Sequence, residues 1–242
     1  MTTDYVLYYW PGIPGRGEYV RLVFEDAGIA YEDVAKATDA MERMSAVLDG
    51  DRGGPLPFAP PILEMDGMLV SQTIHICQVL SERLGTLPAE PAQQLACAQV
   101  GLTIADLIVE AHDTHHPLGA PLYYEDQKDA AKGRAKVFRE QRLPKFLGYL
   151  ERLLERNEAS GGKALVGADI TYVDLAAYQT LEGIWYAFPN AMERVKSDLP
   201  KLHALRDRVA ARPKLAAYLA SERRLGFNEH GLFRRYPELD PA

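Results

Sequence analysis

The sequence predicts a small α/β domain followed by an all-helical domain. Two observations lead to this fold class. Strand and helix patterns alternate as far as residue 84, whereas only helical patterns continue after Pro91. Residues 85–91 are interrupted by prolines and are typical of a linker, so we expect domains at 1–85 and 92–242. The chain has 242 residues, 47% of them hydrophobic, which is enough to build two cores.

The elements of the first domain follow from local patterns. Residues 5–10 are aromatic and β-branched, which predicts a strand. Residues 16–27 carry apolar side chains at helical spacing and stop at Gly28, which predicts a helix. Asp66 and Gly67 separate two apolar runs and indicate a tight hairpin. Further elements are expected as a short strand at 29–34, a short helix at 40–48, a loop at 49–60, strands at 62–65 and 68–70, and a helix at 73–84.

The second domain contains only helical patterns. They cover residues 92–116, 125–157, 172–187, 199–211 and 213–223, which together indicate a helical bundle. Thr171 and Asp174 have the spacing of a capping box, and Ile170 and Leu175 have that of a hydrophobic staple. We interpret this motif as folding architecture without a catalytic role.

Charge and cysteine content exclude several functions. The net charge of −7 argues against nucleic-acid binding, which requires clustered basic surface. The two cysteines, Cys77 and Cys97, lie inside helical patterns and indicate a reducing compartment. We find no N-terminal signal segment and no apolar run near the ~20 residues of a membrane span. The expectation is a cytoplasmic protein without a membrane partner.

Residues 60–73 combine features that suit ligand binding. Pro60 and Pro61 precede a short strand, and the bond between them can be cis. Thr73 opens a helix whose free backbone N–H groups and positive dipole end favour a carboxylate. A rigid bend beside such a helix end can hold a peptide-like ligand by its backbone and its charged terminus.

The domain order and two motifs resemble cytosolic glutathione transferases of the tyrosine type (mu, pi, alpha and sigma classes). The first motif is Tyr9-Trp10 followed by a turn through Arg16, apparently one residue longer than usual. The second runs from Pro60-Pro61 through Asp66-Gly67 to Gln72-Thr73. The resemblance covers almost the whole chain. It implies a thioredoxin-like N-terminal domain that binds glutathione and a helical domain that supplies the electrophile pocket and dimer contacts.

The resemblance implies that the protein conjugates reduced glutathione, as co-substrate, to an apolar electrophile. Tyr9 would donate a hydrogen bond to the thiolate and stabilise this nucleophilic form. By strand alternation Tyr8 points to the opposite face, so only one of the two can serve. Packing of the strand is the alternative role for Tyr9. A non-catalytic binding protein of the same fold, or a glutathione-dependent isomerase or ether-cleaving enzyme, is the alternative function.

The same resemblance implies the glutathione contacts. Gln72 and Thr73 match the pair that binds the γ-glutamyl end, and Thr73 can also serve as an ordinary N-cap. Asp106 matches an aspartate that reaches the glutathione of the neighbouring subunit, which implies a homodimer; the alternative is a solvated aspartate on a helix face. The remaining expected contacts are Tyr9, Trp10, Arg16, Pro60 and Pro61. Arg16 can instead pair with Glu18 or Glu25, and Pro60 departs from the family because it has no N–H to donate.

Ile13, His116 and Phe227 are expected in the electrophile pocket. His116 lies ten residues beyond Asp106, where several tyrosine-type classes have a pocket aromatic, and a histidine there can act as a general acid. A polar residue at a helix end is its alternative role. Phe227 belongs to an apolar tail that can cover the pocket or pack on the bundle. His112 and His116 are one helical turn apart, in a segment whose four histidine or acid groups can bind a metal. No further ligand motif is apparent elsewhere in the chain, so no metal is expected.

Overall fold

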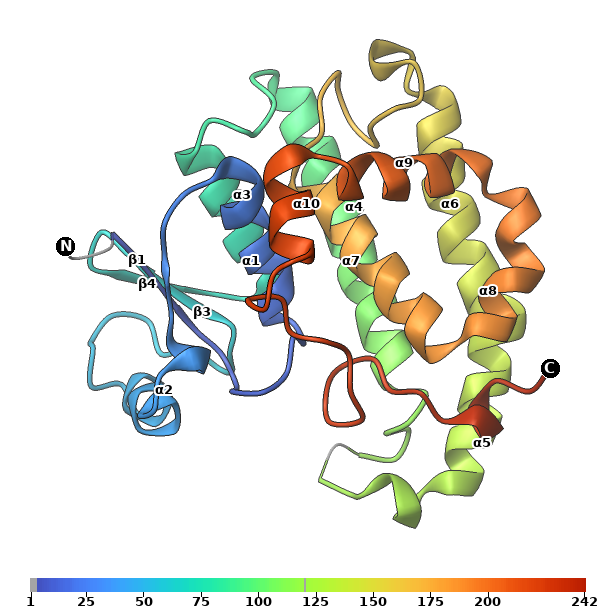
Figure 1. The fold of residues 1–242 in the computed structure, drawn as a ribbon, viewed down its shortest axis with the longest axis horizontal. Helices are drawn as coiled ribbons and strands as arrows, with labels where there is room; N and C mark the ends of the chain where they lie inside the picture. The colour runs from blue at the N-terminus through green and yellow to red at the C-terminus, as the bar shows by residue number, and fades with distance from the viewer. Residues whose placement is uncertain (1–3, 120) are drawn as a thin grey trace. The chain divides into compact units, whose positions relative to one another are not determined.

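The computed structural model describes Asp4–Gly119 and Pro121–Ala242, which form two compact units (Figure 1). The first unit contains the chain as far as Leu87 together with Ala211–Gly226. The second contains Pro88–Ala210 and Phe227–Ala242. Ala211–Gly226 therefore packs with the α/β unit, although its sequence lies inside the stretch expected to form the helical domain.

A mixed four-stranded sheet forms the centre of the first unit, with the order β2-β1-β3-β4. Its strands are β1 (Tyr5–Tyr8), β2 (Glu32–Asp33), β3 (Ile62–Met65) and β4 (Met68–Ser71). The β1–β2 pair is parallel, while β1–β3 and β3–β4 are antiparallel. The expected hairpin is confirmed, because Asp66 and Gly67 both have positive φ, 50° and 71°, between the two paired strands.

Four helices complete the first unit: α1 (Gly17–Ala27), α2 (Ala40–Leu48), α3 (Thr73–Arg83) and α10 (Pro213–Leu219). Gly28 ends α1 in the left-handed conformation with φ 73°, as its position in the sequence predicts. Two expected strands are shorter than predicted. The strand at 5–10 stops at Tyr8, and the strand at 29–34 contains only Glu32 and Asp33.

Buried charge explains why Ala211–Gly226 joins the first unit. Glu18 on α1 is fully buried and faces Arg21, at 3.3 Å. Tyr218 donates a hydrogen bond of 2.9 Å to the same carboxylate, and Arg224 pairs with it as well. A buried carboxylate requires such partners. The pattern that predicted a helix at 213–223 contains no information about this pairing across two hundred residues.

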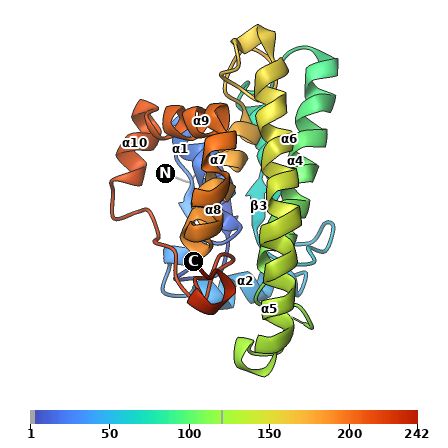
Figure 2. The ribbon, with the colours of Figure 1, turned by 90° about the vertical axis from the view of Figure 1, so that its right-hand side faces the viewer.

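The second unit is helical. Its helices are α4 (Pro91–His112), α5 (Lys128–Val137), α6 (Leu143–Arg156), α7 (Tyr172–Ala187), α8 (Pro189–Val195) and α9 (Pro200–Ala210). Short 3₁₀ turns of this unit lie at Tyr124–Asp126, Glu158–Ser160, Lys196–Asp198 and Pro237–Leu239, and the first unit has one at Val34–Lys36. Helix α8 was not expected from the sequence. The single helix expected at 125–157 is interrupted by a π turn at Phe138–Arg142, and Figure 2 shows α5 and α6 nearly in line. Pro144 has no N–H for the preceding turn, which favours the irregularity there.

Helix α4 meets the length and composition test for a membrane span. A window of it has a mean hydropathy of 1.3, and 39% of that window is buried inside the protein. Core helices of soluble proteins meet the same test, so this is weak evidence for a membrane segment. The expectation that no apolar run approaches the length of a span nevertheless does not hold for α4.

Candidate functional site

The sheet brings three residues of the two motifs to one end of the first unit. Tyr8 pairs with Ile62, and Ile62 pairs with Ser71. Tyr9, which follows β1, Pro61, which precedes β3, and Gln72, which follows β4, therefore lie next to one another in register. The peptide bond between Pro60 and Pro61 is cis, as the sequence suggested, and both prolines are buried.

Tyr9 is held tightly against the turn that enters α1. Its ring fills the space over Gly15 and Gly17, where an added Cβ would come within 2.2 Å of the hydroxyl and 2.7 Å of the ring, respectively. The backbone N–H of Arg16 donates a hydrogen bond of 2.7 Å to the hydroxyl oxygen. Burial raises the pKa of Tyr9, against a smaller lowering by this N–H and by the Arg16 charge. The hydroxyl therefore keeps its proton near neutral pH and can donate it in a hydrogen bond.

Tyr8 has different surroundings from Tyr9. Its side chain is buried in a core cluster with Val34, Ala40, Val47 and Ile62. The Tyr8 hydroxyl donates a hydrogen bond of 2.7 Å to Glu64 on β3. Burial and this carboxylate raise the pKa of Tyr8. These contacts explain Tyr8 as a packing residue of the sheet.

The entrance to α3 is strained and has an open N-terminus. Gln72 occupies the N-cap position with φ 73° and ψ 114°, a conformation that side-chain-bearing residues rarely adopt. In the described part of the chain, no side chain caps this helix. Thr73 is the first helical residue and is buried, so the alternative in which Thr73 is the N-cap is wrong.

The other expected contacts of this unit have varied environments. Glu18 and Glu25 are engaged by Arg21 and Arg223, so the structure gives Arg16 no such pairing with them. The Arg16 side chain is half-buried close to Tyr9. Trp10 is partly exposed at the end of the strand, and Ile13 is half-buried in the turn that follows.

The three expected site residues of the second unit differ in exposure. Asp106 is exposed on α4. His116 is buried, and its Nδ1 lies 3.1 Å from the side-chain nitrogen of Gln127. Burial and the nearby charge of Arg234 lower the pKa of His116. Phe227 stacks on Tyr186 with ring centroids 5.2 Å apart. This contact favours packing on the helical bundle over covering the pocket, the two roles that the sequence left open for Phe227.

The structure brings the three histidines of the segment 112–116 together. His112, His115 and His116 each offer a ring nitrogen, and these nitrogens all lie within 4.8 Å of one another. Burial lowers the pKa of His115 to about 2, with smaller contributions from His112 and Arg234. His115 and His116 lie in the turn after α4, where their ring nitrogens come close to that of His112.

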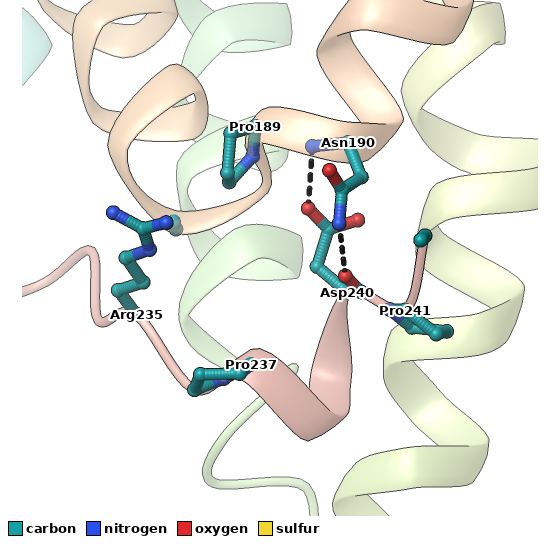
Figure 3. A pocket seen from close by; sticks show the side chains of 8 residues that line it. Pro189, Asn190, Arg235, Pro237, Asp240 and Pro241 are labelled. Atoms are coloured by element: carbon teal, nitrogen blue, oxygen red, sulfur yellow. Dashed lines mark hydrogen bonds between the residues drawn. The ribbon is translucent and has the colours of Figure 1, made fainter.

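Two cavities of the second unit lie near the chain's end. One of about 470 Å³ is lined by His116, Tyr124, Glu229, Arg234 and Tyr236, among others. The other, of about 260 Å³, lies beside α8 (Figure 3). There the carboxylate of Asp240 accepts hydrogen bonds from the N–H groups of Asn190 and Ala191, and the Asn190 amide donates to the Asp240 carbonyl. Asp240 thus caps α8, and we interpret this second cavity as structural.

A mixed four-stranded sheet with a tyrosine and a cis-proline at one end, together with a separate helical unit, defines the glutathione transferase fold. The family model described as "Glutathione S-transferase, C-terminal domain" matches residues 112–222. The chain is 29% identical to glutathione S-transferase P 1 of Xenopus laevis over 222 residues, covering 91% of this chain and 93% of that protein. It is 25% identical to S-crystallin 4 of Enteroctopus dofleini over 227 residues, covering 93% of this chain and 99% of that protein.

Solved structures agree on the fold. The structure of prostaglandin synthase D of Nilaparvata lugens superposes with a TM-score of 0.71 at 18% identity, covering 90% of this chain and 98% of that one. The family model and these relatives together support a glutathione S-transferase.

Proposed function

We propose that this glutathione S-transferase conjugates the thiolate of reduced glutathione to an apolar electrophile, with Tyr9 as the catalytic residue. The observation that carries the proposal is the register of the sheet, with Tyr9, Pro61 and Gln72 at one end. In the reaction, the sulfur forms a bond to an electrophilic carbon, and the leaving group departs with the electron pair of the broken bond. The protein must keep the sulfur ionised and hold it in position to attack the electrophilic carbon.

Tyr9 has the properties of a hydrogen-bond donor to a thiolate. Its raised pKa keeps the proton on oxygen, and the N–H of Arg16 donates to that oxygen. A hydrogen bond accepted by a hydroxyl polarises its O–H and strengthens the bond it donates. The thiolate is favoured over the thiol because only the charged form gains fully from this donor.

The open entrance of α3 suits the carboxylate of the γ-glutamyl end. Gln72 is exposed and strained, and the helix start after it has unpaired backbone donors and a positive dipole end. Pro60 and Pro61 would hold the cysteinyl part, with one hydrogen bond fewer than usual because Pro60 has no N–H. Trp10 and Arg16 border this end of the sheet in the proposal. Ile13, His116 and Phe227 remain proposed electrophile contacts.

Replacing Tyr9 by Phe tests the proposal most directly. Losing one donor to a developing anion typically lowers a rate by about tenfold to a thousandfold. We expect such a fall in the conjugation rate with an aryl halide, with little change in stability. Tyr8→Phe is the matched control, since it removes a hydroxyl that donates to Glu64 in the sheet and accepts from Arg52. If Tyr8→Phe abolished conjugation and Tyr9→Phe did not, the proposed role of Tyr9 would be wrong.

We also infer a cytoplasmic homodimer. Leu95, Leu102 and Val109 are 68%, 64% and 48% exposed on α4, and their seven-residue spacing puts them on one helix face. Asp106 lies between them and is proposed to reach the glutathione of the second subunit. An exposed apolar stripe of this kind favours association with another surface. Leu102→Glu should produce monomers in sedimentation. Asp106→Ala should weaken glutathione binding and leave the dimer intact. A fully active monomer would contradict both the homodimer and the proposed role of Asp106.

A specific relative supports one second candidate. The similarity to S-crystallin 4 is consistent with a binding protein that has the fold without turnover. Retention on immobilised glutathione without conjugation of any electrophile would favour this candidate.

A further inference from the structure

Three imidazoles meet at the end of α4, within the second unit. The ring centroids of His112, His115 and His116 are 4.9 to 5.2 Å apart. Their candidate ligand nitrogens all lie within 4.8 Å of one another. We propose that these three histidines bind a divalent transition-metal ion of the zinc type.

The spacing is close to what a shared ion requires. Zinc binds imidazole nitrogen at about 2.0–2.1 Å in tetrahedral geometry, which puts the nitrogens about 3.4 Å apart. The widest pair must therefore approach by about 1.4 Å at most. Imidazole rings rotate readily about their second side-chain torsion. His115 and His116 lie in the turn beyond α4, and the His115 N–H donates a hydrogen bond of 3.2 Å to the His112 carbonyl.

His115 contributes a second, independent observation. Its side chain is 1% exposed, and its Nε2 is buried with no hydrogen-bond partner among the described residues. Buried polar atoms are nearly always paired, and exceptions point to a functional role or a bound species. A metal ion among the three rings would pair this nitrogen. No other group within the cluster does so.

The neighbouring residues orient the other two rings. The Asp113 carboxylate lies 3.3 Å from His112 Nδ1, an arrangement that holds the proton on Nδ1 and leaves Nε2 as the ligand atom. Gln127 Nε2 lies within hydrogen-bond distance of His116 Nδ1 and of three carbonyl oxygens. Its two hydrogens cannot serve all four acceptors. His116 is therefore not restricted to one tautomer.

The surroundings provide access and select the ion. His116 lines the cavity of about 470 Å³, whose wall also carries Glu125 and Glu229. These carboxylates oppose the positive charge of Arg234, which lines the same cavity. Three imidazoles with a remaining position for water are typical of zinc, copper and nickel sites, whereas magnesium and calcium prefer oxygen ligands.

The test uses the full-length protein after chelator treatment and dialysis, without glutathione. We expect calorimetry to measure one Zn²⁺ per chain, and Co²⁺ to give the visible absorption bands of a tetrahedral site. Mg²⁺ should give neither signal. His112→Ala and His116→Ala should each weaken Zn²⁺ binding at least tenfold, and Asp113→Asn about tenfold. His75→Ala, at an exposed position on α3, is the matched control and should bind as the wild type does.

His115→Gln tests the buried ligand, and His112→Ala keeps the proposal testable if that variant does not fold. Circular dichroism identifies folded variants. The proposal is overturned if wild-type protein binds neither Zn²⁺ nor Co²⁺ at 1:1 stoichiometry, or if folded His112→Ala and His116→Ala bind Zn²⁺ as tightly as the His75→Ala control.

Discussion

Helices α3 and α7 begin in opposite ways. At the start of α7, the buried carboxylate of Asp174 accepts hydrogen bonds from the N–H groups of Thr171 and Leu165 and from the Thr171 hydroxyl. At the start of α3, Gln72 is exposed, has φ 73°, and no described side chain caps the helix. The start of α7 is closed by the protein's own carboxylate. The start of α3, in the proposed function, receives a carboxylate from the ligand.

This difference separates folding from function. The first N–H groups of any helix need acceptors, and the positive dipole end favours a negative charge. In α7 the capping box of Thr171 and Asp174 supplies the acceptors and the negative charge, and this stabilises the protein. In α3 the chain accepts backbone strain at Gln72, which lowers stability, and we propose that this helix end binds a carboxylate.

Removing Asp174 should have the largest effect on stability. Asp174→Ala leaves two buried N–H groups and one hydroxyl without an acceptor, at about 1–3 kcal/mol for each group fully deprived of a partner. We expect the free energy of unfolding to fall by about 3–4 kcal/mol in chemical denaturation. The matched change at the other helix, Thr73→Ala, should cost less than about 1 kcal/mol. Equal losses at the two helices would remove the distinction drawn between them.

The pH dependence of stability should reflect the same carboxyl group. Burial raises the pKa of Asp174 from 3.8 to about 6, although its hydrogen bonds act in the opposite direction. Between these values the folded protein holds a proton that the unfolded chain has released, so the Asp174 contribution falls as pH rises from about 4 to 6. The change amounts to about 2–3 kcal/mol. Denaturation at several pH values should give Asp174→Asn a smaller decline over this window than the wild type, and identical profiles would contradict the assignment.

Relieving the strain at α3 should increase stability and weaken binding. Gln72→Gly removes a cost of about 1–3 kcal/mol for an unfavourable backbone conformation. Glycine also increases the conformational entropy of the unfolded chain, which lowers the free energy of unfolding by about 0.5–1 kcal/mol. We expect a net gain of about 1 kcal/mol in unfolding free energy together with weaker glutathione binding by calorimetry. Ser71→Gly, in the adjacent paired strand, should only destabilise; a loss of stability in both variants would argue against strain at Gln72.

The smallest expected effect concerns Pro60. Pro60→Val restores a backbone donor worth about 0.5–1.5 kcal/mol net, while Pro61 stays in place. Glutathione should then bind several-fold more tightly in calorimetry. Pro60 can also keep the loop ordered before binding, in which case its loss raises the entropic cost. Unchanged or weaker binding would mean that the cysteinyl part is held differently in this protein.

Short-range signals predicted much of the fold. Gly28 ends α1, Asp66-Gly67 forms the hairpin, and the Thr171–Asp174 box begins α7, all as the sequence predicts. Each of these features depends on a few consecutive residues. Tyr9, Pro61 and Gln72 meet because they flank strands whose register follows from that hairpin and from the antiparallel pairing of β1 with β3.

Long-range contacts decided the rest. The sequence by itself determined the element types, the capping box and the residues at the sheet end, because hydrogen bonds within a turn or strand pair act over short separations. Only the tertiary structure decided that Ala211–Gly226 packs with the α/β unit, where Tyr218 and Arg224 satisfy the buried Glu18. It also decided that His115 turns into a cluster with His112 and His116, because that depends on how the chain leaves α4. Burial and charge pairing across the fold have no local pattern from which they can be predicted.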